Sequence, residues 1–313
     1  MRKDDTRLAI DAAAGAFEKW RGQTARTRAT VLRKWYDLMI ANADDLARIM
    51  TLECGKPLAE SQGEVTYGAS FIQWFSEEAP RLYGDTIPPF SPSQRTLVLK
   101  QPIGVCALIT PWNFPIAMIT RKAGAALAAG CTAVIKPASE TPLSALAIAR
   151  LGEEAGIPEG VLNVVTTESG RGTKEVGEEL CTNETVRKIS FTGSTAVGKL
   201  LMKQASGTIK KVSLELGGNA PFIVFEDADI DAAVEGCIQS KFRNTGQTCV
   251  CVNRIYVHSS IYSTFAERLA ARVKSFKVGH GLDEGVTIGP LISDSGLEKV
   301  RRHVEDAKEG GAE

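Results

Sequence analysis

The stretch GVCALITPWNFPIAMITRKAGAALAAGCTAVIK, residues 104–136, decides the fold class. Its first apolar run, Val105–Thr110, is typical of a short buried parallel strand. A helix is predicted over about Ile116–Ala129, and Gly130 is expected to end it. A second apolar run, Cys131–Lys136, predicts the next strand. Strands that alternate with helices in this way indicate a parallel sheet with helices on both faces.

The same alternation continues towards the C-terminus. A helix is predicted from Pro142 towards Gly156, because proline suits the first turn of a helix. Strands are predicted over Val161–Val165 and Lys188–Phe191. After Gly218 the pattern restarts with a strand at Ala220–Phe225, a helix from Asp229 to about Arg243 and a strand-like run at Val250–Val257. We therefore predict an α/β chain with two domains, residues 1–216 and 217–313.

The segments before residue 104 differ from this pattern. Apolar residues at helical spacing run from about Leu8 to Met50, and polar turns interrupt them. Residues 84–102 are rich in proline and serine, and they end in the strand-like run Thr96–Lys100. We interpret this segment as a projecting hairpin. A simple surface loop is the alternative.

Composition excludes several classes of protein. The 313 residues are 43% hydrophobic and 24% charged, with 37 basic and 37 acidic side chains. This balance gives no reason to expect a nucleic acid or a membrane surface as partner. The sequence contains no apolar leader and no run long enough to span a membrane. Seven cysteines predict reduced thiols and a cytoplasmic location, and three scattered histidines predict no metal site.

Chemistry is first suggested by KFRNTGQTCVC, residues 241–251. Cys249 follows a turn that contains glycine, and it precedes a predicted strand. A cysteine in this position is expected to be exposed and oriented, and its backbone N–H can help to hold an oxyanion. The alternative for a single cysteine is a buried structural role.

Two further motifs contain polar groups at predicted strand ends. In KVSLELGGN, residues 211–219, alternation places Ser213 and Glu215 on one face of a strand, and the carboxylate then reaches a cleft at the domain junction. In TPWNFP, residues 110–115, Asn113 offers an amide donor at the end of a strand. The alternatives are a surface glutamate and ordinary packing around Trp112.

Together these motifs resemble the aldehyde dehydrogenase superfamily, whose nucleophile motif is F-x-N-x-G-Q-x-C. The matching residues are Phe242, Asn244, Gly246, Gln247 and Cys249. The resemblance implies that Cys249 is the nucleophile and that Glu215, in E-L-G-G, is the general base. It also implies that Asn113 and the Cys249 backbone N–H stabilise the oxyanion.

The resemblance also implies a nicotinamide cofactor bound by residues 1–216. In VIKPASET, residues 134–141, Lys136 ends a strand and can contact ribose hydroxyls or a phosphate. Relatives that prefer NAD often have an acidic residue at the position of Ser139, which would repel a 2′-phosphate. We therefore expect NADP, with NAD as the alternative because Glu140 is adjacent.

The phosphates of that cofactor are expected at FTGSTAVG, residues 191–198. Gly193 and Ser194 open a helix there, so free N–H groups and the helix dipole can face a pyrophosphate. Ser194 is also interpretable as a helix cap, and no G-x-G-x-x-G fingerprint is present. The resemblance adds Trp112, Pro137 and Leu216 as cofactor contacts.

Within the superfamily, PWNFPIAMITRKAG and SKFRNTGQTCVC resemble the succinate-semialdehyde dehydrogenases. The resemblance implies that Arg121 and Arg243 hold the distal carboxylate of the substrate through forked hydrogen bonds. Solvated or ion-paired arginines are the alternative. Cys251 is expected either to form a reversible disulfide with Cys249 or simply to pack within a strand.

The implied reaction oxidises succinate semialdehyde to succinate through a thiohemiacetal and a thioester. The alternatives are a neighbouring substrate, such as glutarate semialdehyde, and a truncated remnant without catalysis. A homo-oligomer (dimer or tetramer) and a role in 4-aminobutyrate degradation are also implied. Members of the family begin earlier and continue past Glu313, so we expect either a fragment or a natural truncation with an incomplete catalytic domain.

Overall fold

The computed structural model describes residues 1–312. The chain forms two compact units: unit 1 comprises Met1–Ala47 and Gln62–Leu216, and unit 2 comprises Arg48–Ser61 and the residues from Gly217 onward. The predicted division at 216/217 assigns Arg48–Ser61 to the first domain, whereas the structure groups this segment with unit 2. Close backbone packing is the reason. A Cβ atom at Gly289 would stand only 2.0 Å from the carbonyl oxygen of Gly55.

The N-terminal region is helical, as the apolar spacing predicts. Its helices are α1 (Lys3–Arg21), α2 (Ala25–Ala41), α3 (Ala43–Cys54) and α4 (Leu58–Glu78), followed by the short 3₁₀ helix η1 (Ala79–Arg81). Helix α2 begins at a threonine cap, because the Thr24 side chain accepts a hydrogen bond from the backbone N–H of Thr27 at 3.1 Å.

A parallel sheet forms the centre of unit 1, with strand order β5-β4-β3-β6-β7. The strands are β3 (Val105–Ile109), β4 (Thr132–Lys136), β5 (Leu162–Val164), β6 (Val186–Thr192) and β7 (Lys211–Glu215). Every residue of β3 and β4 is buried, which explains why both strands are continuous apolar runs. The predicted α/β class is therefore confirmed.

Helices cover both faces of this sheet. They are α5 (Ala117–Ala128), α6 (Pro142–Ala155), α7 (Arg171–Thr182) and α8 (Thr195–Ala205), and η2 (Ser206–Thr208) follows α8. Side chains of α1, α7 and α8 form a core with inward residues of β3 and β6. Gly130 (φ +83°) and Gly156 (φ +97°) follow α5 and α6, and both were predicted as helix stops.

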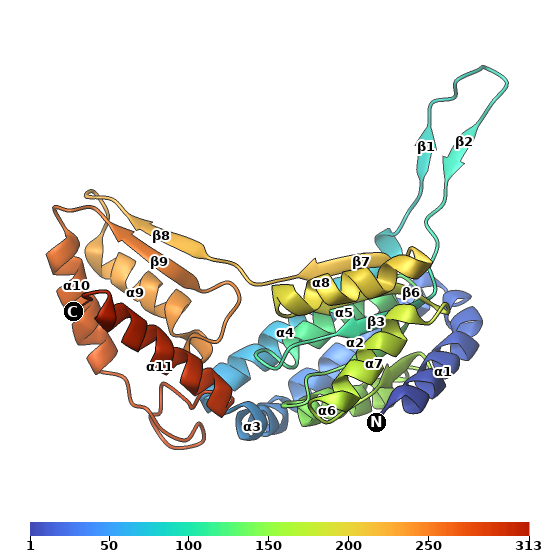
Figure 1. The fold of residues 1–313 in the computed structure, drawn as a ribbon. Helices are drawn as coiled ribbons and strands as arrows, with labels where there is room; N and C mark the ends of the chain where they lie inside the picture. The colour runs from blue at the N-terminus through green and yellow to red at the C-terminus, as the bar shows by residue number, and fades with distance from the viewer. Residues whose placement is uncertain (313) are drawn as a thin grey trace. The chain divides into compact units, whose positions relative to one another are not determined.

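Residues 84–102 form the predicted projecting hairpin. Strands β1 (Asp85–Ile87) and β2 (Thr96–Val98) pair antiparallel, with Asp85 opposite Val98. In Figure 1 the hairpin extends away from the rest of unit 1. Its large apolar side chains are exposed, and Phe90 is completely so.

Unit 2 contains a smaller parallel pair of strands. Strands β8 (Ala220–Val224) and β9 (Val252–Val257) are joined by α9 (Ile230–Lys241) and η3 (Arg243–Gly246). Helices α10 (Tyr262–Lys274) and α11 (Asp294–Glu309) follow. The Asp229 side chain caps α9 by accepting a hydrogen bond from the Ala232 N–H at 3.0 Å. Among residues 1–312, no helix is both long and apolar enough to cross a membrane.

Candidate active site

The turn before Cys249 has an unusual backbone. Asn244, Thr245 and Gly246 have φ values of +51°, +58° and +75°, so three consecutive residues are left-handed. Two of them carry a Cβ atom, and threonine is β-branched, which makes this conformation unfavourable by about 1–2 kcal/mol for each such residue. The surrounding structure must therefore hold the turn in place. Cys249 follows it with an exposed thiol.

Three hydrogen bonds within unit 2 hold this turn. The Glu60 carboxylate accepts from the backbone N–H of Asn244 at 2.8 Å. The Thr245 hydroxyl donates to the Gly289 carbonyl at 3.0 Å. The Gln247 side-chain oxygen accepts from the Ile292 N–H at 3.0 Å. Contacts of the turn with Glu60, Gly289 and Ile292 thus orient the backbone that presents Cys249.

Cys251 differs from Cys249, because it is only 4% exposed. Its thiol donates a weak hydrogen bond to the Gly246 carbonyl, with the sulfur 3.6 Å from the oxygen. Arg243 lies at the start of η3 with an exposed side chain. The structure therefore places Arg243, Cys249 and Cys251 on one short segment of unit 2.

Asn113 lies in unit 1, in the loop between β3 and α5, and it is partly buried. A side chain of α4 holds the start of α5 in place. The Glu64 carboxylate accepts from the N–H groups of Ile116 (3.0 Å) and Ala117 (3.3 Å), and Glu64 is only 1% exposed. A carboxylate suits the positive end of a helix dipole. A Cβ atom at Gly68 would stand 2.7 Å from Ile116, so glycine permits this close approach of the two helices.

Arg121 projects from α5 against two aromatic side chains of α4. Its guanidinium carbon lies 4.7 Å from the ring centre of Phe71 and 5.6 Å from that of Tyr67. Its Nη2 donates to the Tyr67 hydroxyl at 2.5 Å. The Arg121 Nε is buried and has no hydrogen-bond partner among residues 1–312. Cation–π contacts and one hydrogen bond thus orient the guanidinium.

Glu215 lies at the end of β7, on the same face of the strand as Ser213, as alternation predicts. Both residues, together with Arg121 and Lys122, line a cavity of about 420 Å³ in unit 1. Lys122 is buried, and its Nζ donates to the Ser190 hydroxyl at 3.0 Å. Burial lowers the pKa of Lys122 to about 8, although the Glu215 carboxylate opposes this shift.

The predicted cofactor residues come together at the carboxyl ends of the strands. Lys136, Ser139, Gly193 and Ser194 line a second cavity of about 290 Å³ in unit 1. Burial lowers the pKa of Lys136, and the nearby Glu140 carboxylate opposes the shift. The Ser194 hydroxyl caps α8 by accepting from the Val197 N–H at 3.4 Å. A side chain at position 193 would collide with the Phe191 ring, because its Cβ atom would lie 2.4 Å from that ring.

Of the remaining predicted cofactor contacts, Trp112 and Pro137 are sequence neighbours of residues that line this cavity. Trp112 is partly buried and follows Pro111, which lines the cavity. Pro137 is buried, and its carbonyl accepts from Lys136 Nζ at 3.1 Å. Leu216 packs on the core of unit 1, where a Cβ atom at Gly198 would stand 2.7 Å from its side chain.

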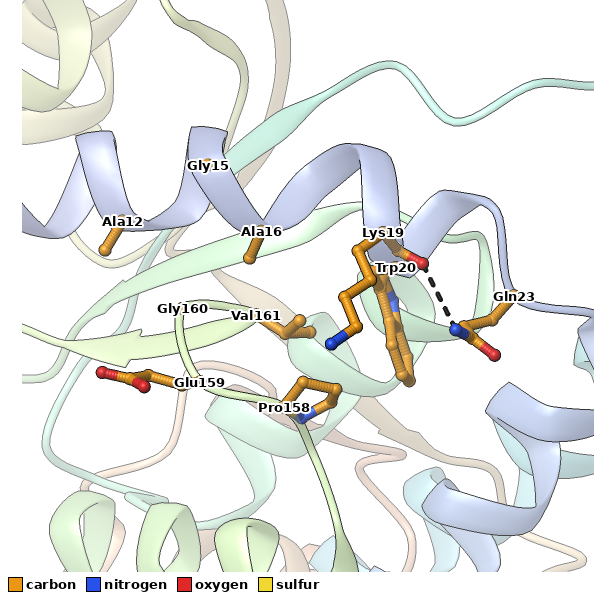
Figure 2. Close-up of a pocket in the computed structure, with 10 residues that line it drawn as sticks. All are labelled: Ala12, Gly15, Ala16, Lys19, Trp20, Gln23, Pro158, Glu159, Gly160 and Val161. Atoms are coloured by element: carbon orange, nitrogen blue, oxygen red, sulfur yellow. Dashed lines mark hydrogen bonds between the residues drawn. The ribbon is translucent and has the colours of Figure 1, made fainter.

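A third cavity, of about 450 Å³, contains none of the predicted site residues. Figure 2 shows it between α1 and the loop that precedes β5. Its wall is formed mainly by small residues of α1 (Ala12, Gly15, Ala16), and Lys19 points into it beside Pro158. It offers no cluster of catalytic groups.

Sequence reasoning missed five residues that act on the site. These residues are Glu60, Glu64, Tyr67, Phe71 and Lys122. Glu64, Tyr67 and Phe71 lie three and four positions apart on α4, so they share one helix face. That spacing was the available signal, but it does not reveal which element the face meets.

Comparisons with known proteins identify the family of the chain. The family model described as "Aldehyde dehydrogenase family" matches residues 1–313. Over 312 residues the chain is 62% identical to the NADP(+)-dependent succinate-semialdehyde dehydrogenase of Escherichia coli K12, and equally to the glutarate-semialdehyde dehydrogenase of Pseudomonas putida KT2440. The crystal structure of an E. coli NADP-dependent enzyme superposes with a TM-score of 0.97 over 99% of the chain, at 61% identity. The chain spans 64% of the length of each of these three proteins.

The Glu60 contact predicts a stability effect. Glu60→Ala removes the acceptor for the buried Asn244 N–H, so the free energy of unfolding in urea should fall by about 1–3 kcal/mol. Glu60→Gln retains an oxygen acceptor and should lose less. Glu267→Ala is the control, because Glu267 is exposed on α10. Equal stabilities of Glu60→Ala and Glu267→Ala would contradict the role of Glu60.

Lys122 predicts a dependence of stability on pH. Its pKa is about 8 in the folded chain, against an ordinary value of 10.5, so the unfolded chain binds more protons between these values. The contribution of Lys122 to stability should therefore increase as the pH rises through this window. Urea unfolding of the wild type and of Lys122→Met across the window measures this effect. The stability of the wild type relative to that of Lys122→Met should rise across the window, and parallel profiles would disprove the effect.

Proposed function

Because the chain belongs to the aldehyde dehydrogenase family, we propose that it oxidises a carboxylate-bearing semialdehyde, succinate semialdehyde, with NADP as oxidant. The observation that carries this proposal is the Arg121 guanidinium, which lines the same cavity as Glu215 and is oriented by Tyr67 and Phe71. A cation at that position favours a substrate with a negative charge remote from its aldehyde.

The proposed reaction starts at Cys249. Its thiolate adds to the aldehyde carbon, and the carbonyl oxygen becomes an oxyanion. The Cys249 backbone N–H and the Asn113 amide donate hydrogen bonds to this oxygen, and loss of one such donor typically costs about 3–4 kcal/mol of transition-state stabilisation. The left-handed turn at 244–246 fixes the backbone of the first donor. The Glu64 cap on α5 fixes the helix that follows the Asn113 loop.

Glu215 completes the proposed reaction. Loss of hydride from the thiohemiacetal carbon leaves a thioester on Cys249. Glu215 then takes a proton from a water molecule, the resulting hydroxide attacks the thioester carbon, and the carboxylate product leaves. The exposed carboxylate of Glu215 at a strand end suits this role, because water has access to it.

The residues of the smaller cavity fit a dinucleotide. Thr110 and Thr192 both line this cavity. Their hydroxyls are buried and have no hydrogen-bond partner among residues 1–312. The N-terminus of α8 offers backbone N–H groups for phosphate, and Lys136 offers a cation. When bound, the nicotinamide group accepts hydride. Ser139 presents a hydroxyl and no carboxylate, which favours NADP, and the neighbouring Glu140 keeps NAD as the alternative.

Two features favour the alternative functions. The identity to a glutarate-semialdehyde dehydrogenase is also 62%, so glutarate semialdehyde is the alternative substrate. The second alternative is a non-catalytic chain that binds nucleotide, because the complete lining of the smaller cavity belongs to unit 1.

The same family membership supports three further proposals. We place the chain in a homo-oligomer, a dimer or tetramer, whose contacts include the exposed apolar residues of the β1–β2 hairpin. We place it in the cytoplasm, because its seven cysteines are free thiols. We assign it to 4-aminobutyrate degradation from the resemblance alone.

Activity tests the proposed nucleophile. The 313-residue chain, and the same chain extended to the length of its relatives, are assayed for NADPH formation with succinate semialdehyde. Cys249→Ala should lower kcat by at least about 10⁴-fold in every active form, because it removes the thiol on which the proposed thioester forms. Cys251→Ala is the matched control and should remain active. Full activity of Cys249→Ala, or no activity in both lengths when folded, would refute the proposal.

Substrate choice tests Arg121. Arg121→Met should lower kcat/KM at least about tenfold more for succinate semialdehyde than for butanal, which has the same number of carbons and no carboxylate. Tyr67→Phe keeps the ring and removes the hydrogen bond, so its effect should have the same direction and be smaller. Comparison with glutarate semialdehyde separates the two candidate substrates, since one methylene is worth about 1–3 kcal/mol. An equal decrease for the charged and the neutral aldehyde would contradict the role of Arg121.

A further inference from the structure

The cavity of about 420 Å³ in unit 1 has a polar floor, which the two outer strands β6 and β7 provide. In β6, Ile189 packs in the apolar core on one face of the sheet, so Lys188 and Ser190 lie on the other face. In β7, Leu214 packs on the same core, and Ser213 lies on the opposite face. Ser190 and Ser213 are direct partners in the register of the two strands. Strand alternation thus places two hydroxyls and an ammonium group side by side on the cavity floor.

The hydrogen bonds at this floor leave more donors than acceptors. The buried Lys122 of α5 donates to the Ser190 hydroxyl at 3.0 Å, and Lys188 Nζ donates to the Ser213 hydroxyl at 2.6 Å. An ammonium group has three N–H donors, and a hydroxyl that accepts a hydrogen bond keeps its own O–H donor. Among residues 1–312 neither lysine forms an ion pair, and the carboxylate that lines the cavity is that of Glu215. The floor therefore suits an anion, which brings acceptors and negative charge.

Helix α5 forms another wall of the cavity, and its character changes along its length. Lys122 is followed at helical spacing by Ala125, Ala126 and Ala129, and all four residues line the cavity. An alanine side chain is a single methyl group, so these positions leave space beside the sheet. Leu108 of β3 lines the same space. The cavity therefore has a charged end, near the two lysines, and an apolar end, near the alanines.

The apolar end lies away from the groups of the proposed reaction. Glu215 is at the carboxyl end of β7, whereas Pro102 precedes β3 and Cys131 precedes β4, at the amino ends of these parallel strands. All three residues line the cavity. The five residues of β3 span about 13 Å, at roughly 3.3 Å for each step. Arg121, the proposed substrate contact, is held against the aromatic rings of α4. The cavity thus extends along the strands beyond the part that the proposed reaction uses.

We propose that this cavity binds a small organic carboxylate that carries an apolar chain. The carboxylate accepts hydrogen bonds from Lys122, Lys188 and the Ser213 hydroxyl, and the apolar chain lies between Leu108 and the alanines of α5. The volume of about 420 Å³ lies within the roughly 300–1,000 Å³ of small-molecule sites. Binding requires neither cofactor nor aldehyde, so the proposal does not rest on the proposed dehydrogenase function.

The test is isothermal titration calorimetry of the 313-residue chain with octanoate, acetate and 1-octanol. The titrations are made at constant ionic strength and at pH 7, below the Lys122 pKa of about 8, so that its ammonium group is charged. Acetate keeps the charge without the chain, and 1-octanol keeps the chain without the charge. We expect saturable binding of octanoate that is at least about tenfold tighter than that of either other probe, because both ends of the ligand contribute. Octanoate that does not bind, or that binds no more tightly than 1-octanol, would overturn the proposal.

Two variants locate the bound octanoate. Lys188→Met keeps the length of the side chain and removes its charge, so it should weaken octanoate binding at least about fivefold and leave 1-octanol binding nearly unchanged. Ala126→Leu fills the apolar end and should weaken both ligands several-fold. Lys34→Met is the matched control, because Lys34 is exposed on α2 and lies outside the cavity. Urea unfolding without ligand verifies that each variant is folded. Octanoate binding that Lys188→Met and Ala126→Leu leave unchanged would place the ligand elsewhere and refute the assignment.

Discussion

The arrangement of the candidate site residues in unit 1 depends on one buried contact, in which the Glu64 carboxylate of α4 binds the first turn of α5. It satisfies two N–H groups that lie within a helix start with no exposed surface. The same helix presents Arg121 and Lys122, and the loop before it presents Asn113. Loss of the carboxylate would leave two buried donors unpaired, and it would release both the helix that carries Arg121 and Lys122 and the loop that carries Asn113.

Unit 2 achieves the corresponding precision by a different means. Its turn at 244–246 adopts backbone angles that the isolated sequence would rarely populate. The Glu60 carboxylate and the Gly289 carbonyl hold those angles by accepting hydrogen bonds from the turn. The segment Arg48–Ser61 belongs to unit 2, and it brings Glu60 to this turn. Unit 1 thus positions its residues by capping a helix. Unit 2 positions Cys249 by a strained turn that hydrogen bonds with other segments of the unit hold in place.

The sequence predicted the regular elements well because their signals are local. Strand β3 ends one residue before its predicted limit, and α5 lies within one residue of its prediction at each end, since glycine and proline bound these apolar runs. Contacts between residues that lie far apart in the sequence were not predicted. Glu60 contacts Asn244 across 184 positions, and Glu64 contacts Ile116 across 52. The spacing of apolar residues along a helix does not indicate which distant backbone groups its carboxylates bind. A carboxylate on a helix usually lies in solvent.

The strand order has a consequence for the motions of the site. In the sheet formed by residues 1–312, β3 lies at the centre, while β7 is bonded to β6 alone and forms an edge. Backbone amides of a central strand exchange with solvent only through large openings, whereas those of an edge strand exchange through local fraying. Glu215 therefore lies on an edge strand, which is less protected than the central strand that the Asn113 loop follows. The proposed general base thus lies on a strand that can adjust to a mobile water molecule, whereas the loop of the proposed oxyanion donor begins at the central strand.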